Sequence, residues 1–299
     1  MTGPSLMDRE IRQQPATIAA TIDALLPRLA ELRRLVEGCR AVTLYARGSS
    51  DTASVYGRYL FEIRANLIAS LGAPSVATLY GAAPDLRDTL AVIISQSGET
   101  DELIEVAGWA KSLGARTIAI TNGGNSRLTS SVEVALVTRA GHELAIPATK
   151  THTAQLALVL TGRGYTLSTA LEIALKAHEV CGLAALGLSG ADLQHGPSAL
   201  ERPGVPLVIA APPSGPCLPA LVACARTALG RGTEVYCIGG NAGLQSICDI
   251  AIPGPALPEA IAPVVGVIPG QVMVEAIARA RGVSPDCPPG LTKVTQTSQ

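Results

Sequence analysis

The sequence has no excess of basic residues, with 23 Lys and Arg against 24 Asp and Glu in 299 residues. A chain without a net basic field has no general attraction for nucleic acid or for an anionic membrane, so we expect neither as a partner. Charged residues and prolines interrupt the apolar stretches before the roughly 18 residues that span a bilayer. The polar start MTGPSLMDREIRQQ also lacks the apolar segment of a signal peptide. The expected location is therefore the cytoplasm.

The sequence also lacks the cysteine spacing of a metal or redox site. Its seven cysteines include no CxxC pair, and its four histidines are dispersed. An odd number of cysteines argues against a disulfide framework and agrees with a reducing compartment. We therefore expect no metal site and no cofactor.

Short β-branched runs alternate with alanine-rich helical patterns along most of the chain. The runs AVTLYA and LAVIIS are almost wholly apolar, which is typical of strands that are buried on both faces of a parallel sheet. Each run is followed by a polar turn and then by a helical pattern, as in LIEVAGWAKSLG after QSGETDE. This order predicts an α/β fold with a doubly wound parallel sheet.

The same order of elements occurs twice. Three pairs, Arg47 with Arg163, Gly98 with Gly215 and Gly114 with Gly232, are separated by roughly 116 to 118 residues. This near-constant offset predicts two tandem flavodoxin-like lobes with a boundary near Leu160. The predicted organisation is an N-terminal helical segment over 1–40, a first lobe over 41–160, a second lobe over 161–285 and a tail over 286–299.

The motif SQSGET lies where an apolar strand meets a helix. Ligands bind at this carboxyl end of the strands in open parallel sheets. The hydroxyls of Ser95, Ser97 and Thr100, the Gln96 amide and the free N–H groups of the helix start can surround a phosphate. The same residues are also common in an ordinary capped turn. The equivalent turn in the second half, AAPPSGP, has few hydroxyls, so we expect only the first lobe to bind phosphate.

Seven motifs together identify a family resemblance that covers almost the whole chain. The motifs are RGSSD, APSVATLYG, SQSGETDELIEVA, PATKTHTAQL, TALEIALKAHE, LQHGP and PPGLTKVTQT. With them the sequence resembles the double SIS-domain proteins, both the isomerase half of glucosamine-6-phosphate synthase and the stand-alone glucosamine-6-phosphate deaminases. The resemblance implies two tandem SIS lobes, an amino-sugar phosphate as substrate, and a homodimer with shared active sites.

The resemblance also assigns the residues that hold the sugar phosphate. They are Ser50, Ser95, Gln96, Ser97 and Thr100. Ala148 stands where the synthases carry a serine that contacts the sugar, which favours the deaminase-like branch. Between TAQL and RGY the relatives carry a longer connection than this chain, so the effect of the shortened junction on activity is open.

The residues implied in catalysis come from the second half and the tail. Glu179 matches the family's proton-transfer carboxylate, and Lys176 would lie on the same helix face and pair with it. His195 matches the histidine that opens the sugar ring from a neighbouring subunit, and Lys293 matches a lysine at the sugar carbonyl. Proton transfer between C1 and C2 needs one carboxylate and a group with a pKa near 7, which suits Glu179 and His195. Taken alone, these residues are more typical of a solvated ion pair, a loop histidine and a free tail lysine.

Three functions compete on this evidence. The first is an amino-sugar-phosphate deaminase or isomerase, and the second is a SIS module that binds a sugar phosphate without catalysis. The retained Glu179, His195 and Lys293 favour the first. The third is a complete glutamine-dependent synthase, which needs an N-terminal nucleophilic cysteine, whereas the first cysteine here is Cys39. Which amino sugar is used, and which amine leaves, is open.

Overall fold

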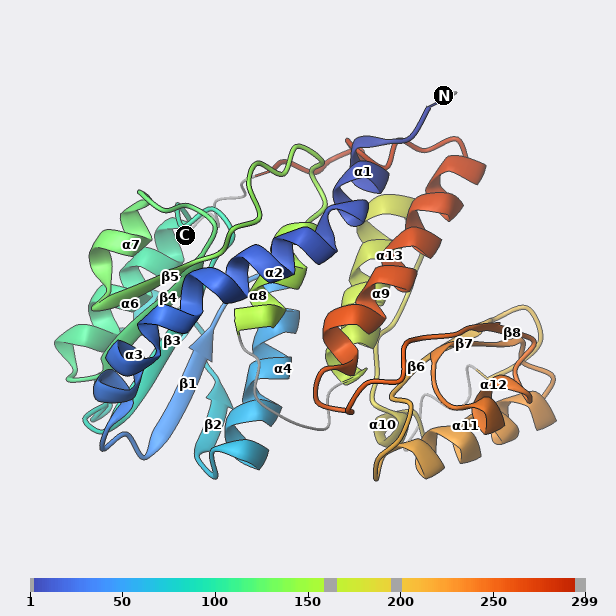
Figure 1. Cartoon of the computed structure of the whole chain (residues 1–299), viewed down its shortest axis with the longest axis horizontal. Coiled ribbons are helices and arrows are strands. Elements are labelled where there is room, and N and C mark those ends of the chain that lie inside the picture. The colour runs from blue at the N-terminus through green and yellow to red at the C-terminus, as the bar shows by residue number, and fades with distance from the viewer. Residues whose placement is uncertain (1–2, 159–165, 195–200, 294–299) are drawn as a thin grey trace. The chain divides into compact units, whose positions relative to one another are not determined.

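The computed structural model describes residues 3–158, 166–194 and 201–293, which belong to two compact units (Figure 1). The first unit consists of Met1–Leu160 together with Pro285–Gln299, and the second consists of Thr161–Ser284. The residues that follow position 285 therefore belong to the first unit and not to the second.

The first unit is built on a sheet of five parallel strands. The strands are β1 (Ala41–Tyr45), β2 (Ile68–Leu71), β3 (Thr89–Ile94), β4 (Arg116–Thr121) and β5 (Val134–Val137). Their order is β2-β1-β3-β4-β5, which is the flavodoxin-like order. In this order the chain moves one way from β1 to β2 and the other way from β3 to β5. A crevice therefore opens between β1 and β3 at the carboxyl ends of the strands.

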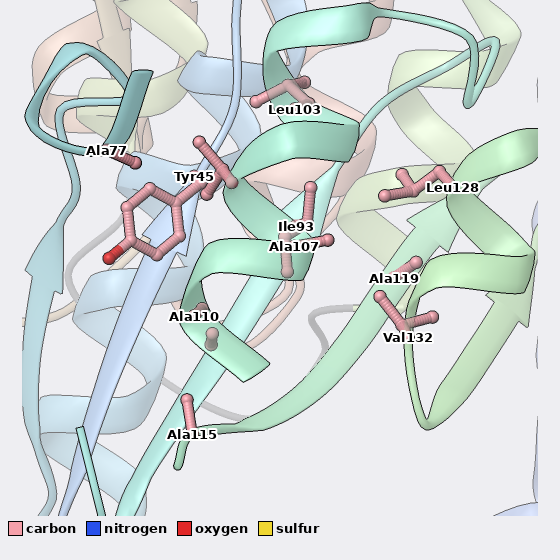
Figure 2. Packing of buried hydrophobic residues seen from close by; sticks show 12 residues of the cluster. Tyr45, Ala77, Ile93, Leu103, Ala107, Ala110, Ala115, Ala119, Leu128 and Val132 are labelled. Carbon is pink, nitrogen blue, oxygen red and sulfur yellow. The ribbon is translucent and has the colours of Figure 1, made fainter. Parts of the chain in front are cut away.

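Helices cover both faces of this sheet. The helices of this unit are α1 (Leu6–Arg12), α2 (Gln14–Leu25), η1 (Leu26–Arg28), α3 (Leu29–Val36), α4 (Ser49–Arg64), α5 (Ser75–Thr78), α6 (Asp101–Ser112), α7 (Arg127–Ser131) and α8 (Lys150–Leu158). Side chains alternate along β3, so that Ile93 packs under α6 and its neighbour Val92 packs on the opposite face. Figure 2 shows the first of these layers, in which Ala107 and Ala110 let α6 lie close to the strands.

The second unit carries a smaller parallel sheet in the order β6-β7-β8. Its elements are α9 (Thr166–Cys181), α10 (Gly190–Gln194), β6 (Leu207–Ala211), α11 (Leu218–Gly230), β7 (Val235–Gly239), α12 (Ala242–Gln245), β8 (Ile250–Ile252) and α13 (Ala262–Ala280). Apolar side chains of α11 and the strands, among them Ile209, Ala225 and Val235, form its core.

The predicted internal repeat is confirmed at two of its three pairs. Gly98 and Gly215 follow β3 and β6 with φ of 70° and 112°, and Gly114 and Gly232 end α6 and α11 with φ of 90° and 80°. Glycine is the residue that adopts these positive φ values without strain. The third pair involves Arg163, which lies outside the described residues.

The junction between the lobes falls partly outside the structural description. Helix α8 continues through Leu158, and α9 begins at Thr166. The lobe boundary predicted near Leu160 therefore falls within residues 159–165, which lie outside the described residues.

One described helix departs from the expectation that no apolar stretch is long enough to span a membrane. Helix α13 is 19 residues long, and its length and apolar composition alone would allow it to cross a membrane. Half of its most apolar stretch is buried, and residues such as Val267 and Val274 are fully enclosed. A core helix passes the same test, and α13 packs on α9 within the second unit.

Candidate active site

The turn after β3 forms a preorganised loop at the start of α6. The Gly98 N–H donates to the Ser95 Oγ at 3.2 Å, and the Glu99 N–H donates to the Ser97 Oγ at 3.1 Å. Thr100 is the N-cap of α6, and its side chain makes no capping hydrogen bond. The start of α6, where a negative charge is favoured, and the partly exposed side chains of Gln96, Ser97 and Thr100 thus offer a site to an anion.

Gly98 is required at this turn for two reasons. Its φ is 70°, and an added Cβ would lie 2.1 Å from the Ser126 Oγ and 2.9 Å from the Thr121 Oγ1. The backbone therefore approaches its neighbours more closely than any side chain would permit. This close packing determines the position of the hydroxyls on either side of the glycine.

The turn after β1 supplies the second wall of the crevice. Ser50 lies in the first turn of α4, is buried, and donates to the Gln155 Oε1 at 3.2 Å. The Gln155 Nε2 is buried and has no hydrogen-bond partner among the described residues, so it is a donor that a ligand could satisfy. Arg47 binds Glu102 through two contacts of 2.7 and 2.9 Å, which tie this turn to α6.

A pocket of about 590 Å3 adjoins the turn after β3. Gln96 and Ser97 lie on one side of it, and residues that follow β4 and β5, including Asn122 and Thr138, lie on the other. Glu143 also lines the pocket. The site therefore combines a turn rich in donors with a cavity large enough for a small polar molecule.

Glu143 is the acidic residue of this site that the sequence analysis did not identify. Its carboxylate is buried and accepts hydrogen bonds from the Gln96 Nε2 at 3.2 Å and from Thr149 and Thr151 at the start of α8. The predicted residue Lys293 donates to it, also at 3.2 Å. A single Glu in the segment GHEL carries no local pattern that would have indicated this role.

The segment between Glu143 and α8 contains Ala148, which is partly buried. The segment is held from outside by Glu10 of α1, which accepts the N–H groups of Leu144 and Ala145. Burial raises the pKa of the Glu10 carboxyl. Lys150 lies 4.0 Å from Glu10 and donates to Gln13 at 2.7 Å. The N-terminal helix thus fixes the loop that carries Ala148.

The second unit contains the predicted pair of Lys176 and Glu179 on α9. The Lys176 Nζ lies 2.6 Å from Glu179 and 3.4 Å from Glu172, a residue that the sequence analysis did not single out. The side chains of Lys176 and Glu172 are 1% and 0% exposed, while Glu179 is 22% exposed. The interpretation of a solvated surface pair is therefore wrong, because the lysine and one carboxylate are enclosed.

The two carboxylates beside Lys176 affect its pKa. Burial alone would lower the pKa of Lys176, but Glu172 and Glu179 more than offset that effect, so the pKa is raised. The two acids therefore favour the protonated form of Lys176. Such a cation can orient the accessible carboxylate of Glu179 without competing for a substrate proton.

The two units thus hold different parts of the predicted set. Ser50, Ser95, Gln96, Ser97, Thr100, Ala148 and Lys293 belong to the first unit, and Lys176 and Glu179 belong to the second. His195 lies outside the described residues. Within residues 3–158, 166–194 and 201–293, no group of three His, Cys, Asp or Glu side chains is placed to hold a metal ion.

In the second unit, a glutamate side chain lies against the turn that corresponds to the turn after β3. An added Cβ at Gly215 would lie 2.0 Å from the Glu259 Oε2. Glu259 is buried, so a carboxylate of the chain itself lies where a bound anion would approach. That only the first lobe binds phosphate stays a prediction.

Comparison with known proteins connects this site to a family. Residues 36–161 match the SIS domain. The isomerizing glutamine–fructose-6-phosphate aminotransferase of Methanothermobacter thermautotrophicus is 30% identical over 96% of this chain and 56% of its own length. The enzyme of that name from Thermococcus kodakarensis is 28% identical over 97% of this chain and 58% of its own. The chain therefore spans a little more than half the length of these relatives.

Solved structures resemble the whole chain. A protein of Silicibacter pomeroyi, provisionally named a phosphosugar isomerase, superposes with a TM-score of 0.86 and 26% identity over 95% of this chain and all of its own. The glucosamine-6-phosphate deaminase of Thermotoga maritima superposes with a TM-score of 0.80 at 22% identity over 98% of this chain and 100% of that one. The second likeness shows the shared fold.

Replacing Gly98 with Ala tests whether the turn after β3 is the anion site. The positive φ alone should lower the free energy of unfolding by about 1 to 2 kcal/mol, and the close contacts should distort the turn. We expect phosphate binding, measured by calorimetry, to be lost. Gly114→Ala is the matched control, because Gly114 also has a positive φ but ends the same helix. If both variants bound phosphate equally, the anion site would lie elsewhere.

Proposed function

We propose that this chain, whose residues 36–161 match the SIS domain, is an enzyme that converts an amino-sugar phosphate to a ketose phosphate. The proposed reaction is the conversion of glucosamine 6-phosphate and water to fructose 6-phosphate and ammonia. The name of the Thermotoga maritima structure motivates the choice of substrate. This isomerase-type chemistry needs no glutamine as a nitrogen donor, although the longer relatives are named for one.

The observation that carries the proposal is the enclosed group of Glu172, Lys176 and Glu179. An ion pair is costly to bury, so a chain that buries a lysine between two acids must compensate for the desolvation. Only Glu179 of the three remains accessible. An accessible carboxylate beside a fixed cation is suited to proton transfer. A module that only bound the sugar would have no need of this arrangement.

The proposed chemistry proceeds in three steps. His195 assists opening of the sugar ring, which exposes the C1 aldehyde. Glu179 then transfers the C2 proton to C1 while a proton passes from the C2 amine to the C1 oxygen, which gives the 2-imine of the ketose and its C1 hydroxyl. Water adds to this imine and releases ammonia, leaving the carbonyl of fructose 6-phosphate. No net proton is gained or lost by Glu179.

The proposed substrate contacts follow from the first unit. The helix α6 N-terminus and the side chains of Ser95, Gln96, Ser97 and Thr100 hold the phosphate, and Ser50 contributes from α4. Three of these hydroxyls already lie at the turn after β3, so little rearrangement is needed for binding. Lys293 is proposed to contact the open-chain sugar at its carbonyl carbon.

We further propose a cytoplasmic homodimer in which His195 reaches the site of the neighbouring chain. Both the location and the assembly rest on the sequence and on the family resemblance. The alternative function is a sugar-phosphate-binding module without catalysis. It would be favoured if the protein bound amino-sugar phosphates but neither turned them over nor exchanged their protons.

Removing two hydroxyls of the turn tests the phosphate contacts. Ser97→Ala with Thr100→Ala should weaken glucosamine 6-phosphate binding by at least about tenfold, because a hydrogen bond to a charged group is worth about 1.5 to 3 kcal/mol. Calorimetry measures the affinity, and thermal unfolding measures the stability. Ser112→Ala, at the other end of α6, should bind normally. Unchanged affinity in the double variant would place the phosphate elsewhere.

Replacing the proposed base separates binding from catalysis. Glu179→Gln keeps the shape of the side chain but removes the basic oxygen, so turnover should fall by about 10² to 10⁴ while binding persists. Deuterium incorporation from solvent at C1 or C2 should vanish with it. Glu275→Gln is the control, since Glu275 is also a buried helical acid of the second unit, near Arg279. Near wild-type turnover in Glu179→Gln would show that Glu179 is not the base that transfers the proton.

Mixing two inactive variants tests the shared site. Glu179→Gln and His195→Ala chains should each be inactive alone but should regain part of the activity when subunits exchange, because some hybrid sites then contain both residues. Exchange itself is followed with differently tagged chains. Demonstrated exchange without recovery of activity would mean that each site is formed within one chain.

A further inference from the structure

Glu143 connects three separate segments of the first unit. Its Oε1 accepts the Thr149 N–H at 2.8 Å, the Thr149 hydroxyl at 3.1 Å and the Thr151 N–H at 3.2 Å. Its Oε2 accepts the Thr151 hydroxyl, the Gln96 amide and the Lys293 ammonium. The side chain is 0% exposed, so these groups replace water completely.

The two oxygens of Glu143 differ in what they hold. Oε1 accepts only from residues at the start of α8, where a negative charge is favoured by the helix dipole. This fixes the carboxylate on a rigid element. Oε2 is thereby directed toward the turn after β3 and toward the C-terminal tail. One carboxylate therefore links the proposed phosphate site to Lys293.

Lys293 is held by more than this ion pair. Its Nζ also donates to the Ala145 carbonyl at 2.6 Å and lies 3.4 Å from the Ile146 carbonyl. An ammonium has three protons, and three oxygen atoms surround this one. The side chain is 28% exposed, so it remains in reach of a small molecule. Lys293 is thus both oriented and accessible.

We propose that Glu143 is a positioning residue that holds the Lys293 ammonium and the Gln96 amide in one fixed arrangement. The inference rests on the proposed function, in which Gln96 binds the phosphate and Lys293 contacts the carbonyl end of the same sugar. A shared anchor sets the spacing between these two ends of the substrate. Misplacing a positioned group by about 1 Å costs on the order of 10²-fold in rate.

A second acidic residue, Glu10, also holds the loop near Lys293. The conformation of the loop can therefore be considered separately from the charge of Glu143. Glu10 accepts the N–H groups of Leu144 and Ala145, and within the described part of the chain it makes no hydrogen bond or ion pair with Lys293 or Gln96. Its neighbouring cation is Lys150, at 4.0 Å. The loop conformation is therefore supported without Glu143, and the distinct contribution of Glu143 is its Oε2.

A double-mutant cycle tests the proposal with glucosamine 6-phosphate. Glu143→Gln should lower kcat by about 10- to 100-fold when Lys293 is present, since the amide lacks the negative charge that pairs with the ammonium and replaces one acceptor oxygen with a donor. Lys293→Met should lower kcat on its own, and adding Glu143→Gln to it should lower kcat little further. Glu143→Asp keeps the charge and should retain more activity than Glu143→Gln.

Each outcome of the cycle has one meaning. If Glu143→Gln lowered kcat by the same factor with and without Lys293, Glu143 would not act through the lysine and the inference would be overturned. If Lys293→Met kept wild-type turnover, the role proposed for Lys293 would fail instead. Glu133→Gln is the stability control, because Glu133 likewise accepts a backbone N–H and a threonine hydroxyl, from Thr117. It should leave kcat unchanged.

A measurement without substrate tests the anchor directly. Acetic anhydride acetylates neutral amines, and peptide mass spectrometry reports the rate at each lysine. In folded Glu143→Gln protein, or in Glu143→Asp if the first does not fold, Lys293 should react faster relative to exposed Lys111 than in the wild type. An unchanged ratio would show that Glu143 does not hold the ammonium, whatever reaction the protein performs.

Discussion

The buried carboxylate of Glu143 is the interaction on which the first unit's site depends. A charge without access to water must be compensated by donors, and none of its donors is an immediate chain neighbour. They come from the turn after β3, the start of α8 and the C-terminal tail. Satisfying one carboxylate therefore brings together segments that are distant in sequence, and it places Lys293 on the first unit.

The order of the strands determines where this arrangement lies. Because the connections leave β1 and β3 in opposite directions, the two turns that follow them flank a crevice at the carboxyl edge of the sheet. The contact between Arg47 and Glu102 holds the two turns together. Gly98 lets the backbone pack tightly there, which fixes the position of the turn that carries Ser97 and Thr100.

The two halves of the chain share the order of their backbone elements but carry different polar and charged side chains. Matching glycines end matching elements, which reflects the common backbone. The first unit keeps an open turn rich in donors, whereas Glu259 lies against the corresponding turn of the second unit. The second unit contributes the group of Lys176, Glu172 and Glu179 instead. A phosphate site and a proton-transfer site are thus assigned to separate lobes in the proposed function.

Local patterns in the sequence determined the α/β class, the internal repeat and the turn SQSGET, because strand alternation, glycine turns and helix starts are set by near neighbours. The spacing of Lys176 and Glu179 also predicted their contact, but i,i+3 spacing is the same for a surface pair and an enclosed one. Only the tertiary structure decided that Lys176 is buried, since α13 and the sheet must pack on α9 to exclude water. The link between Glu143 and Lys293 likewise joins residues 150 positions apart, and no local pattern encodes a contact made by the folding of the whole unit.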